Sequence, residues 1–330
     1  MALTNKLTAI GDAIREKTGT TELLKLDEMP SAIASIETGG SRYAPRSISF
    51  AGYTGTELDY ELANLDTSRL TTMHSFFHNC TQLKNIDLSG FDSSNVTDMS
   101  YMFNNITKIE ALDLSPLNTS KVTKMHNMFQ SCASNNINFK LEFPSSFDTS
   151  NVTNMDTMFR SCYVQKLEFP YFNTSKTLNM SYMFAGCRFL TELDVSSFDT
   201  SSVTNMGYMF QECQQITKID LKNFNGTKLT NASYMFNKCP ALEEIDLSGL
   251  NTPVLSNMSY MFANCPMLNK IDIRNMTFDK VGSYANIFNN VPYDCLIIVK
   301  SDTERDWITS KWANYTNIKT LAEYQAEGGV

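Results

Sequence analysis

A phenylalanine recurs along most of this chain at nearly constant spacing, and this repeat limits the possible folds more than any other feature. The intervals between successive copies are 26, 26, 30, 25, 26, 26, 26 and 26 residues. A unit of this length cannot bury its own apolar face and is stable only when neighbouring units stack on it. The sequence therefore predicts a solenoid in which each copy forms one coil. The repeated residues are Phe77, Phe103, Phe129, Phe159, Phe184, Phe210, Phe236, Phe262 and Phe288.

The copy at residues 198–223 shows what one coil is expected to contain. Asp199-Thr200-Ser201 predicts a turn or helix cap, because these side chains bond to nearby backbone. The apolar residues of 206–213 stand at i, i+3, i+4 and i+7, which predicts a helix of about two turns. The segment 216–221 predicts a short strand whose alternate residues point inward. The Val-Thr pair before the helix is compatible with a second extended stretch.

Two copies have unusual lengths. The copy that begins at Leu117 has 30 residues, and its extra residues are expected to form a loop around 133–138. The copy that begins at Phe147 is one residue short.

We expect an α/β repeat solenoid with a parallel sheet and short helices, wound as a right-handed superhelix.

Seven of the eight cysteines occupy one slot, three residues after the phenylalanine. Ile106 and Val291 fill that slot in the other two copies, so the slot is expected to be small, buried and apolar, with reduced thiols stacked in a row. Bridging between some of the thiols is the alternative. Cys295 lies outside the slot, in the C-terminal cap. The methionines are expected to fill gaps in the core, and a metal-thioether or redox role is the alternative. The seven cysteines are Cys80, Cys132, Cys162, Cys187, Cys213, Cys239 and Cys265.

Composition and motifs argue against several classes of function. The net charge of −8 is unsuited to binding nucleic acid. The first residues have no apolar core of a secretory signal, and no apolar run is long enough to span a membrane. There is no P-loop, G-x-G-x-x-G, nucleophile elbow or Cys-x-x-Cys motif. His74, His78 and His126 all fall in repeat slots, and Cys80 near His78 is expected to point into the core. We therefore expect no catalysis, no cofactor and no metal site.

An acidic residue occupies the outward slot of each predicted strand. We interpret this column as a solvated face whose repulsion is relieved by lysines on neighbouring strands. A face that binds a partner is one alternative. Calcium binding is another, although one carboxylate per coil is far short of the six to eight oxygens that calcium takes. The column consists of Asp87, Asp113, Glu142, Glu168, Asp194, Asp220, Asp246 and Asp272.

A tyrosine often precedes the Met-Phe pair, and on the helical interpretation this slot lies beside the buried face. A row of half-exposed tyrosines suits contact with a protein or a glycan. Packing of ring on ring between coils is the alternative. The row consists of Tyr101, Tyr182, Tyr208, Tyr234 and Tyr260.

The repeats resemble those of known proteins. The L-x-x-L-x-L strands look like leucine-rich repeats, and x-V-T-x-M-x-x-M-F-x-x-C is similar to the BspA-like bacterial branch. More closely, they resemble a family of bacterial and phage proteins built from Phe-Asp-Thr-Ser-x-Val-Thr-x-Met repeats. The likeness covers roughly residues 63 to 291 and implies a leucine-rich-repeat-like solenoid. One departure is that Cys precedes the strand here, so the usual asparagine ladder is not expected.

The N-terminal segment has a separate resemblance. Residues 13–19 (Ala-Ile-Arg-Glu-Lys-Thr-Gly), with Leu26 and Met29-Pro30, are similar to the N-terminal module of phage minor tail structural proteins. Apolar residues also form a seam of two heptads in this segment. They predict either a small helix packed on residues 23–36 or a short self-associating bundle, a trimer if the chain belongs to a phage fibre. The seam consists of Leu3, Leu7, Ile10 and Ile14.

The chain divides into four expected parts. Residues 1–40 form a helical docking or oligomerisation module and 41–62 an N-terminal cap, while 63–291 hold nine repeats and 292–330 a C-terminal cap. In the last part, residues 296–299 predict a final strand and 302–315 a helix. Trp307 and Trp312 are expected to close the core, and sugar binding by them is the alternative.

The resemblances imply a non-enzymatic protein of the phage virion, associated with the tail or baseplate and assembled in the host cytoplasm. Its N-terminus would bind phage structural proteins, and its solenoid would bind a glycan or protein of the host surface. The alternatives are a BspA-like adhesin at the bacterial cell surface and a structural virion decoration without receptor binding.

Overall fold

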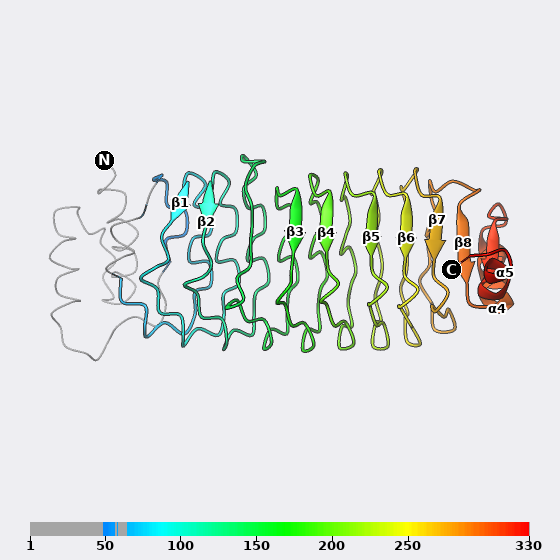
Figure 1. The fold of residues 1–330 in the computed structure, drawn as a ribbon, viewed down its shortest axis with the longest axis horizontal. Helices are drawn as coiled ribbons and strands as arrows, with labels where there is room; N and C mark the ends of the chain where they lie inside the picture. The colour runs from blue at the N-terminus through cyan, green and yellow to red at the C-terminus, as the bar shows by residue number, and fades with distance from the viewer. Residues whose placement is uncertain (1–48, 57, 59–64, 330) are drawn as a thin grey trace.

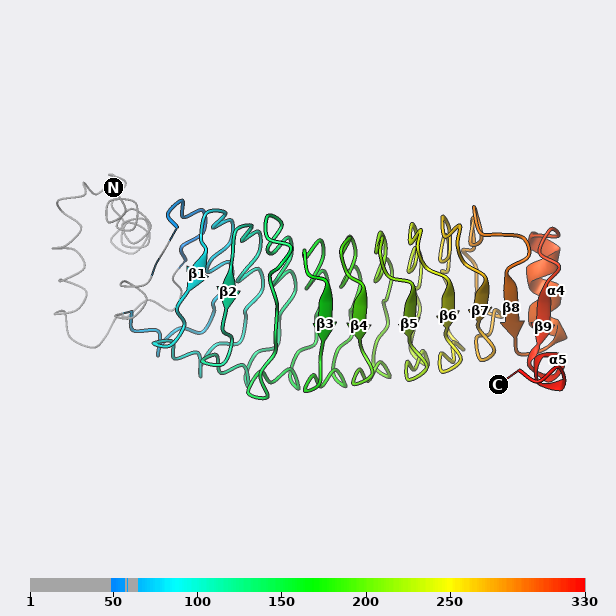
Figure 2. The same cartoon turned by 45° about the horizontal axis from the view of Figure 1, so that its top comes forward.

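The computed structural model describes residues 49–56, 58 and 65–329. These residues form a long rod in which successive coils lie side by side along one axis (Figure 1). Figure 2 shows the same strands in one row, with the turns of each coil above and below them. The expected N-terminal module, including Leu3, Leu7, Ile10 and Ile14, and most of the expected N-terminal cap lie outside the described residues.

The strands are short and parallel, and each one belongs to a different coil. Inward residues alternate with outward ones in the repeat strands up to β6, as predicted, so that the three residues of β5 are exposed, buried and exposed in turn. In β7 and β8, next to the cap, consecutive residues are buried. Strands β1 and β2 pair with each other, β3 pairs with β4, and β5 to β9 form one sheet in chain order. The strands are β1 (Asn85–Ile86), β2 (Ala111–Leu112), β3 (Lys166–Glu168), β4 (Glu192–Asp194), β5 (Lys218–Asp220), β6 (Glu244–Asp246), β7 (Lys270–Asp272), β8 (Leu296–Val299) and β9 (Ile318–Thr320).

A second parallel column runs through the residue that follows each Val-Thr pair. Here one residue per coil forms an isolated bridge to its equivalents in the neighbouring coils, as Asn205 does to Asn179 and Asn231. The column extends from Thr72 to Ser283. The extended stretch near the Val-Thr pair is therefore present, although it is only one bridge long.

The short helices expected within the repeats are not present among the described residues. Tyr208 and Glu212 have φ angles of 62° and 59°, in the left-handed region, and the same two slots are left-handed in all nine copies. Backbone N–H groups alternate in their partners: that of Met209 bonds to Met206 O within the coil, and that of Phe210 to Met235 O in the next. Because a helix directs every N–H along its own axis, the helical prediction was wrong. A series of tight turns places the same apolar side chains inward.

Those inward side chains form one continuous core, as predicted. The nine repeated phenylalanines are buried and stack in a single column, with adjacent rings nearly parallel; Phe210 and Phe236 have centroids 5.4 Å apart. The extra residues of the long copy form turns at the surface, where Ile137 is exposed. Burial of large aromatic rings against one another is what stabilises coils that have so little regular secondary structure.

Polar residues hold the corners of each coil. In the copy at 198–223, the N–H groups of Ser201, Gly207 and Lys222 donate to the side-chain oxygens of Asp199, Asn205 and Asp220 at 2.9, 3.0 and 3.1 Å. A side-chain acceptor two residues earlier in the chain defines an Asx turn. The Asp-Thr-Ser prediction is confirmed, and two further turns of this kind complete the coil.

The C-terminal cap closes the open end of the core. Strand β8 is confirmed, and α4 (Asp302–Lys311) ends before the predicted residue 315. The ring of Trp307 lies 4.7 Å from that of Phe278, and that of Trp312 lies 5.3 Å from Phe288, so both tryptophans pack on the core as expected. Strand β9 and α5 (Leu321–Ala326) follow and were not predicted. Within the described residues, both helices fall short of the length and apolar character that a membrane span requires.

Candidate functional site

The tyrosine row is a stack of parallel rings. Centroids of adjacent rings from Tyr182 to Tyr260 lie 4.3, 4.5 and 4.6 Å apart, and the planes differ by at most 10°. Ring-on-ring packing, one of the two interpretations of this row, is therefore present. Because the faces cover one another, the row offers ring edges and hydroxyl groups to solvent. Partial burial raises the pKa of Tyr208 and of Tyr234.

Each end of the stack has a polar side chain. The Arg160 guanidinium lies 5.3 Å from the centroid of the Tyr182 ring, in a cation–π contact. At the other end, the Asn286 amide donates to the Tyr260 hydroxyl at 2.7 Å. The stack therefore extends over four coils and ends at Arg160 on one side and Asn286 on the other.

Tyr101 belongs to the same slot but has different neighbours. Three histidine rings contact it edge-on: His74 at 5.5 Å, His78 at 6.0 Å and His126 at 5.5 Å between centroids. The pKa of His126 is lowered, chiefly because the imidazole is partly buried. The Nδ1 atoms of His78 and His126 are buried without a hydrogen-bond partner. Tyr101 is therefore part of an aromatic cluster separate from the four-ring stack.

The acidic column is aligned in register along the sheet. Glu168 pairs with Asp194 across β3 and β4, and Asp220 and Asp246 pair across β5 and β6. The aspartates also act as turn formers: the Ser196 N–H donates to Asp194 Oδ1 at 2.9 Å. The Ser196 hydroxyl, and after it this N–H, lowers the pKa of Asp194. The carboxylates thus have a structural role that the sequence analysis did not assign to them.

Asp272, at the end of the acidic column, was predicted to face solvent, but the structure buries it. Its side chain is buried, with 2% of the residue exposed, and Arg274 Nε lies 2.9 Å from Asp272 Oδ1. The cap covers this part of the sheet, because Lys270 Nζ donates to the Tyr324 hydroxyl of α5 at 2.9 Å. The expectation was wrong at this position because Arg274 pairs with Asp272, and Tyr324 of the cap, far away in the sequence, lies against Arg274.

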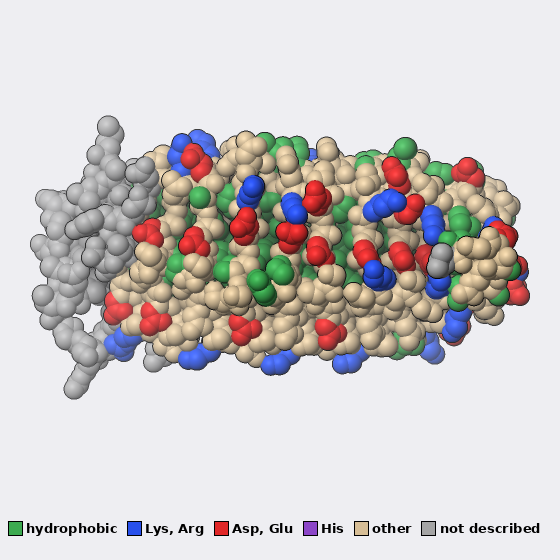
Figure 3. Space-filling view, in the orientation of Figure 1, with side chains coloured by type: hydrophobic (Ala, Val, Ile, Leu, Met, Phe, Trp, Pro, Cys, Tyr) green, Lys and Arg blue, Asp and Glu red, His purple; other side chains and the backbone are tan. Residues whose placement is uncertain are grey.

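Lysines lie close to the acidic column, but their ion pairs with it form within one coil and not with a neighbouring strand as expected. Lys166 Nζ lies 3.0 Å from Glu168 of the same strand, and Lys222 Nζ lies 2.9 Å from Asp220 of the same coil. The cross-strand pairs, Lys166 with Glu192 at 3.4 Å and Lys218 with Glu244 at 3.3 Å, involve glutamates outside the column. Figure 3 shows acidic and basic side chains side by side over the strands, with apolar side chains between them. Exposed pairs of this kind contribute little stability, but they leave the face with mixed charge.

The thiols are unsuited to nucleophilic chemistry. All eight cysteines are free and buried, and burial raises the pKa of Cys80, Cys265 and Cys295 to about 12. The Cys213 thiol donates to Phe184 O of the preceding coil at 3.3 Å. A thiol with such a pKa is protonated at neutral pH, and the thiolate is the reactive form. The expectation of a reduced, stacked row is in agreement with this arrangement.

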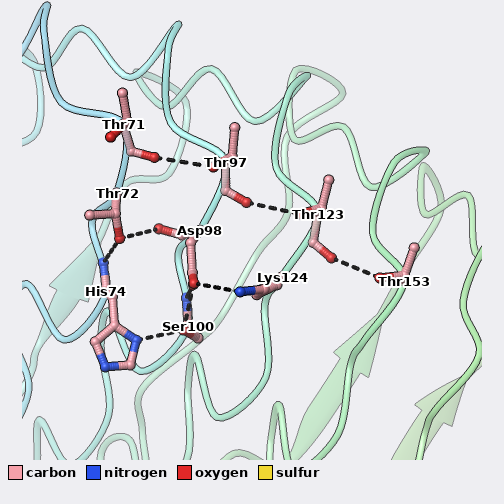
Figure 4. A network of polar contacts seen from close by, with 9 residues as sticks. All are labelled: Thr71, Thr72, His74, Thr97, Asp98, Ser100, Thr123, Lys124 and Thr153. Atoms are coloured by element: carbon pink, nitrogen blue, oxygen red, sulfur yellow. Dashed lines mark hydrogen bonds and ion pairs between the residues drawn. The ribbon is translucent and has the colours of Figure 1, made fainter.

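One polar network combines a carboxylate, a hydroxyl and an imidazole (Figure 4). The Ser100 hydroxyl lies 2.5 Å from Asp98 Oδ1 and 2.7 Å from His74 Nδ1. The hydroxyl has one proton, so when it donates to Asp98 it accepts from Nδ1 of His74, which then cannot act as a base toward it. Ser100 is also fully buried. This network therefore orders the coil and does not form a nucleophile.

Threonine and asparagine columns beside this network were missed by the sequence analysis. The Thr97 hydroxyl donates to Thr71 O at 3.3 Å and the Thr123 hydroxyl to Thr97 O at 3.2 Å, a row that Figure 4 shows. In the bridge column, the Asn231 amide donates to Asn205 Oδ1 at 2.9 Å. One asparagine pair in this column is thus hydrogen-bonded side chain to side chain, in a different place from the ladder of leucine-rich repeats. Its signal was the recurrence of asparagine in this slot, at Asn154, Asn179, Asn205, Asn231 and Asn257.

The arrangement offers surfaces for binding. Among the described residues, no group of three or more His, Cys, Asp or Glu side chains is placed to hold a metal ion. The fold is a parallel repeat solenoid whose outward residues recur in register from coil to coil.

Comparison with known proteins identifies the family of this chain. The model of the family described as "Mycoplasma protein of unknown function, DUF285" matches residues 47–142, 135–244, 192–294 and 216–317. The chain belongs to this family. None of the curated proteins matches it.

Among solved structures, the chain is similar to a leucine-rich repeat protein from Bacteroides ovatus ATCC 8483. The sequences are 13% identical, the TM-score is 0.30, and the likeness covers 74% of this chain and 68% of the other.

Proposed function

We propose that this chain is a non-enzymatic binding protein of a phage virion, associated with the tail or baseplate. Residues 1–40 would attach it to other phage structural proteins, and the solenoid would bind a glycan or protein of the host surface. The N-terminal resemblance to phage minor tail proteins supports the virion location. The observation that carries the binding role is the in-register recurrence of outward side chains, because a surface of identical steps suits contact with another extended surface.

The tyrosine stack gives this proposal a specific contact surface. Its rings are already packed on each other, so a partner would contact ring edges and hydroxyls. Replacing Tyr182, Tyr208, Tyr234 and Tyr260 together with Phe keeps the stack and removes only the hydroxyls. We expect this variant to fold normally and to attach more weakly to host cells. Unchanged attachment would place the binding surface elsewhere on the rod.

A second candidate is a surface adhesin of a bacterial cell. The family description names Mycoplasma proteins, and Mycoplasma is a cellular bacterium, which favours this candidate. The binding surfaces are the same, and the two candidates differ in where the chain is located.

Mass spectrometry of purified virions tests the location. The virion proposal expects peptides of this chain in particles, in a fixed ratio to a tail protein. The adhesin proposal expects its peptides among those released by protease treatment of intact bacterial cells. Absence from particles would overturn the virion proposal. A chain that is present in particles and bound to no host component would be a structural decoration.

A further inference from the structure

The C-terminal end of the solenoid carries a pocket of about 600 Å³. One wall is the last tight turn, at residues 286–293, together with Pro266 of the preceding coil. The other is the end of α4 and the connection that follows it, at residues 311–315. A volume of this size is in the range of small-molecule sites. The walls come from the last two repeats and from the cap, so the pocket lies where the solenoid ends.

Aromatic side chains form the apolar part of this pocket. Tyr293 is 61% exposed, and its ring meets that of Tyr315 edge-on at 5.4 Å. The Tyr315 hydroxyl lies 2.7 Å from Phe288 O and 2.9 Å from Val291 O, which fixes Tyr315 against the turn. Trp312, on the opposite wall, is held edge-on against Phe288. The aromatic groups are therefore supported by the core, and the Tyr293 ring remains open to a ligand.

Amide side chains form the polar part. Asn289, Asn290 and Asn314 line the pocket, and all three are exposed. Within the described part of the chain, their side chains make no hydrogen bond to another residue. Each amide offers two donors and one acceptor oxygen. Three such groups around one pocket can bind adjacent hydroxyl groups of a ligand.

The charge of the pocket differs from that of the strand face. Lys311 is the single charged residue in the lining, and its ammonium group lies 5.4 Å from the Tyr284 ring. No carboxylate lines the pocket. A neutral ligand is therefore compatible with it, whereas the strand face is dominated by ion pairs.

The pocket also adjoins the tyrosine stack. Asn286, in the pocket lining, donates to the hydroxyl of Tyr260, the last ring of the stack. A ligand longer than the pocket can continue along the hydroxyl edges of that row. This continuity favours a chain-like ligand with many hydroxyl groups.

We propose that this pocket binds a neutral carbohydrate chain, with a sugar ring against Tyr293 and Trp312 and its hydroxyls bonded to Asn289, Asn290 and Asn314. Sugars present apolar C–H faces to aromatic rings and hydroxyls to amides, and this pocket offers both groups together. The inference rests on the proposed binding function and specifies its ligand class and its place on the rod.

Tryptophan fluorescence of the purified full chain tests this proposal. The chain has two tryptophans: Trp312 lines the pocket, and Trp307 packs on Phe278. The probes are soluble cello-, chito-, manno- and malto-oligosaccharides. We expect a saturable change with at least one of them, at a Kd of about 1 mM or tighter.

Matched variants locate the binding. Tyr293→Ala, and separately Asn289→Ala with Asn290→Gly, should weaken affinity at least about tenfold. Tyr293→Ala should lower the unfolding midpoint only slightly, since it loses one ring contact, and the asparagine variant should leave the midpoint unchanged. Glycine is chosen at position 290 because Asn290 has a φ of 59°. Tyr171→Ala is the control, because Tyr171 is 56% exposed and lies outside the pocket. It should bind as the unaltered chain does.

Two results would overturn the carbohydrate site. One is the absence of saturable binding for every oligosaccharide at about 10 mM, ten times the weakest expected Kd; the other is unchanged affinity in both pocket variants. These results are independent of where the chain is found, since virion or cell-surface location is measured separately.

Discussion

The rings of Tyr208 and Tyr234 lie face to face, with centroids 4.5 Å apart and planes 6° apart. Both residues have left-handed backbones, with φ of 62° and 57°. A left-handed conformation costs a residue with a side chain about 1–2 kcal/mol. The ring stack and the hydrogen bonds to the next coil offset that cost, so the stack is part of what holds the tight turns together.

Substitution of Tyr208 by glycine or by alanine distinguishes a left-handed turn from a helix at this position. Tyr208→Ala and Tyr208→Gly both lose two ring contacts, at about 0.5–1.5 kcal/mol each. In a left-handed turn, glycine relieves strain, so Tyr208→Gly should be more stable than Tyr208→Ala by about 1 kcal/mol. In a helix the order would be reversed by about the same amount. Guanidinium denaturation measures the difference, and a less stable glycine variant would contradict the turn geometry.

The sequence was sufficient to predict the solenoid and its inward residues. Phe210 and Cys213 are apolar and recur once per coil. Any solenoid with this period therefore places both side chains in its core. The helix was a wrong interpretation because the i, i+3, i+4, i+7 spacing also fits consecutive tight turns. Asn79 and Gly186, which occupy a left-handed slot, were a signal against helix, since these residues favour that conformation.

The site residues were harder to predict because their surroundings depend on distant segments. The tyrosine row was found from its slot, but only the structure shows that its faces are covered. The burial of Asp272 depends on the cap, where Tyr324 lies over the strand face. The C-terminal pocket joins residues 286–293 to 311–315, and no spacing rule relates these two segments.

Substitution of Asp246 by asparagine tests whether the aspartates of the acidic column act by accepting the hydrogen bond of a turn. The Ser248 N–H donates to Asp246 Oδ1 at 2.8 Å, and an asparagine oxygen can accept the same bond. Asp246→Asn should therefore keep the stability of the unaltered chain or exceed it, because like charges on adjacent strands are removed. Asp246→Ala loses the bond and should cost about 1 kcal/mol. If both variants lose equal stability in urea denaturation, the charge itself is required and the turn account fails.

The buried thiols predict a loss of stability at high pH. The Cys265 thiol has a pKa of about 12, raised chiefly by burial from an ordinary 9.0. Between these two values the folded chain holds a proton that the unfolded chain releases. The free energy of unfolding is therefore unaffected by this thiol below pH 9 and falls above it, by about 1.4 kcal/mol per pH unit for each such thiol.

A valine variant isolates the contribution of one thiol. Cys265→Val retains a small apolar side chain in a slot that Val291 occupies naturally. Its unfolding free energy, measured by urea denaturation from pH 8 upward, should decline less steeply than that of the unaltered chain. Identical slopes would show that the thiol is already exposed to water in the folded state.

Thiol titration with Ellman's reagent tests the stacked dry core most directly. The chain has eight cysteines, and all are free and buried. In the native protein almost no thiol should react with the reagent within minutes. In guanidinium without reductant, the same sample should show eight reactive thiols per chain. Rapid reaction of several thiols in the native protein would contradict the continuous core. Fewer than eight equivalents after unfolding would show disulfide bridges in place of the reduced row.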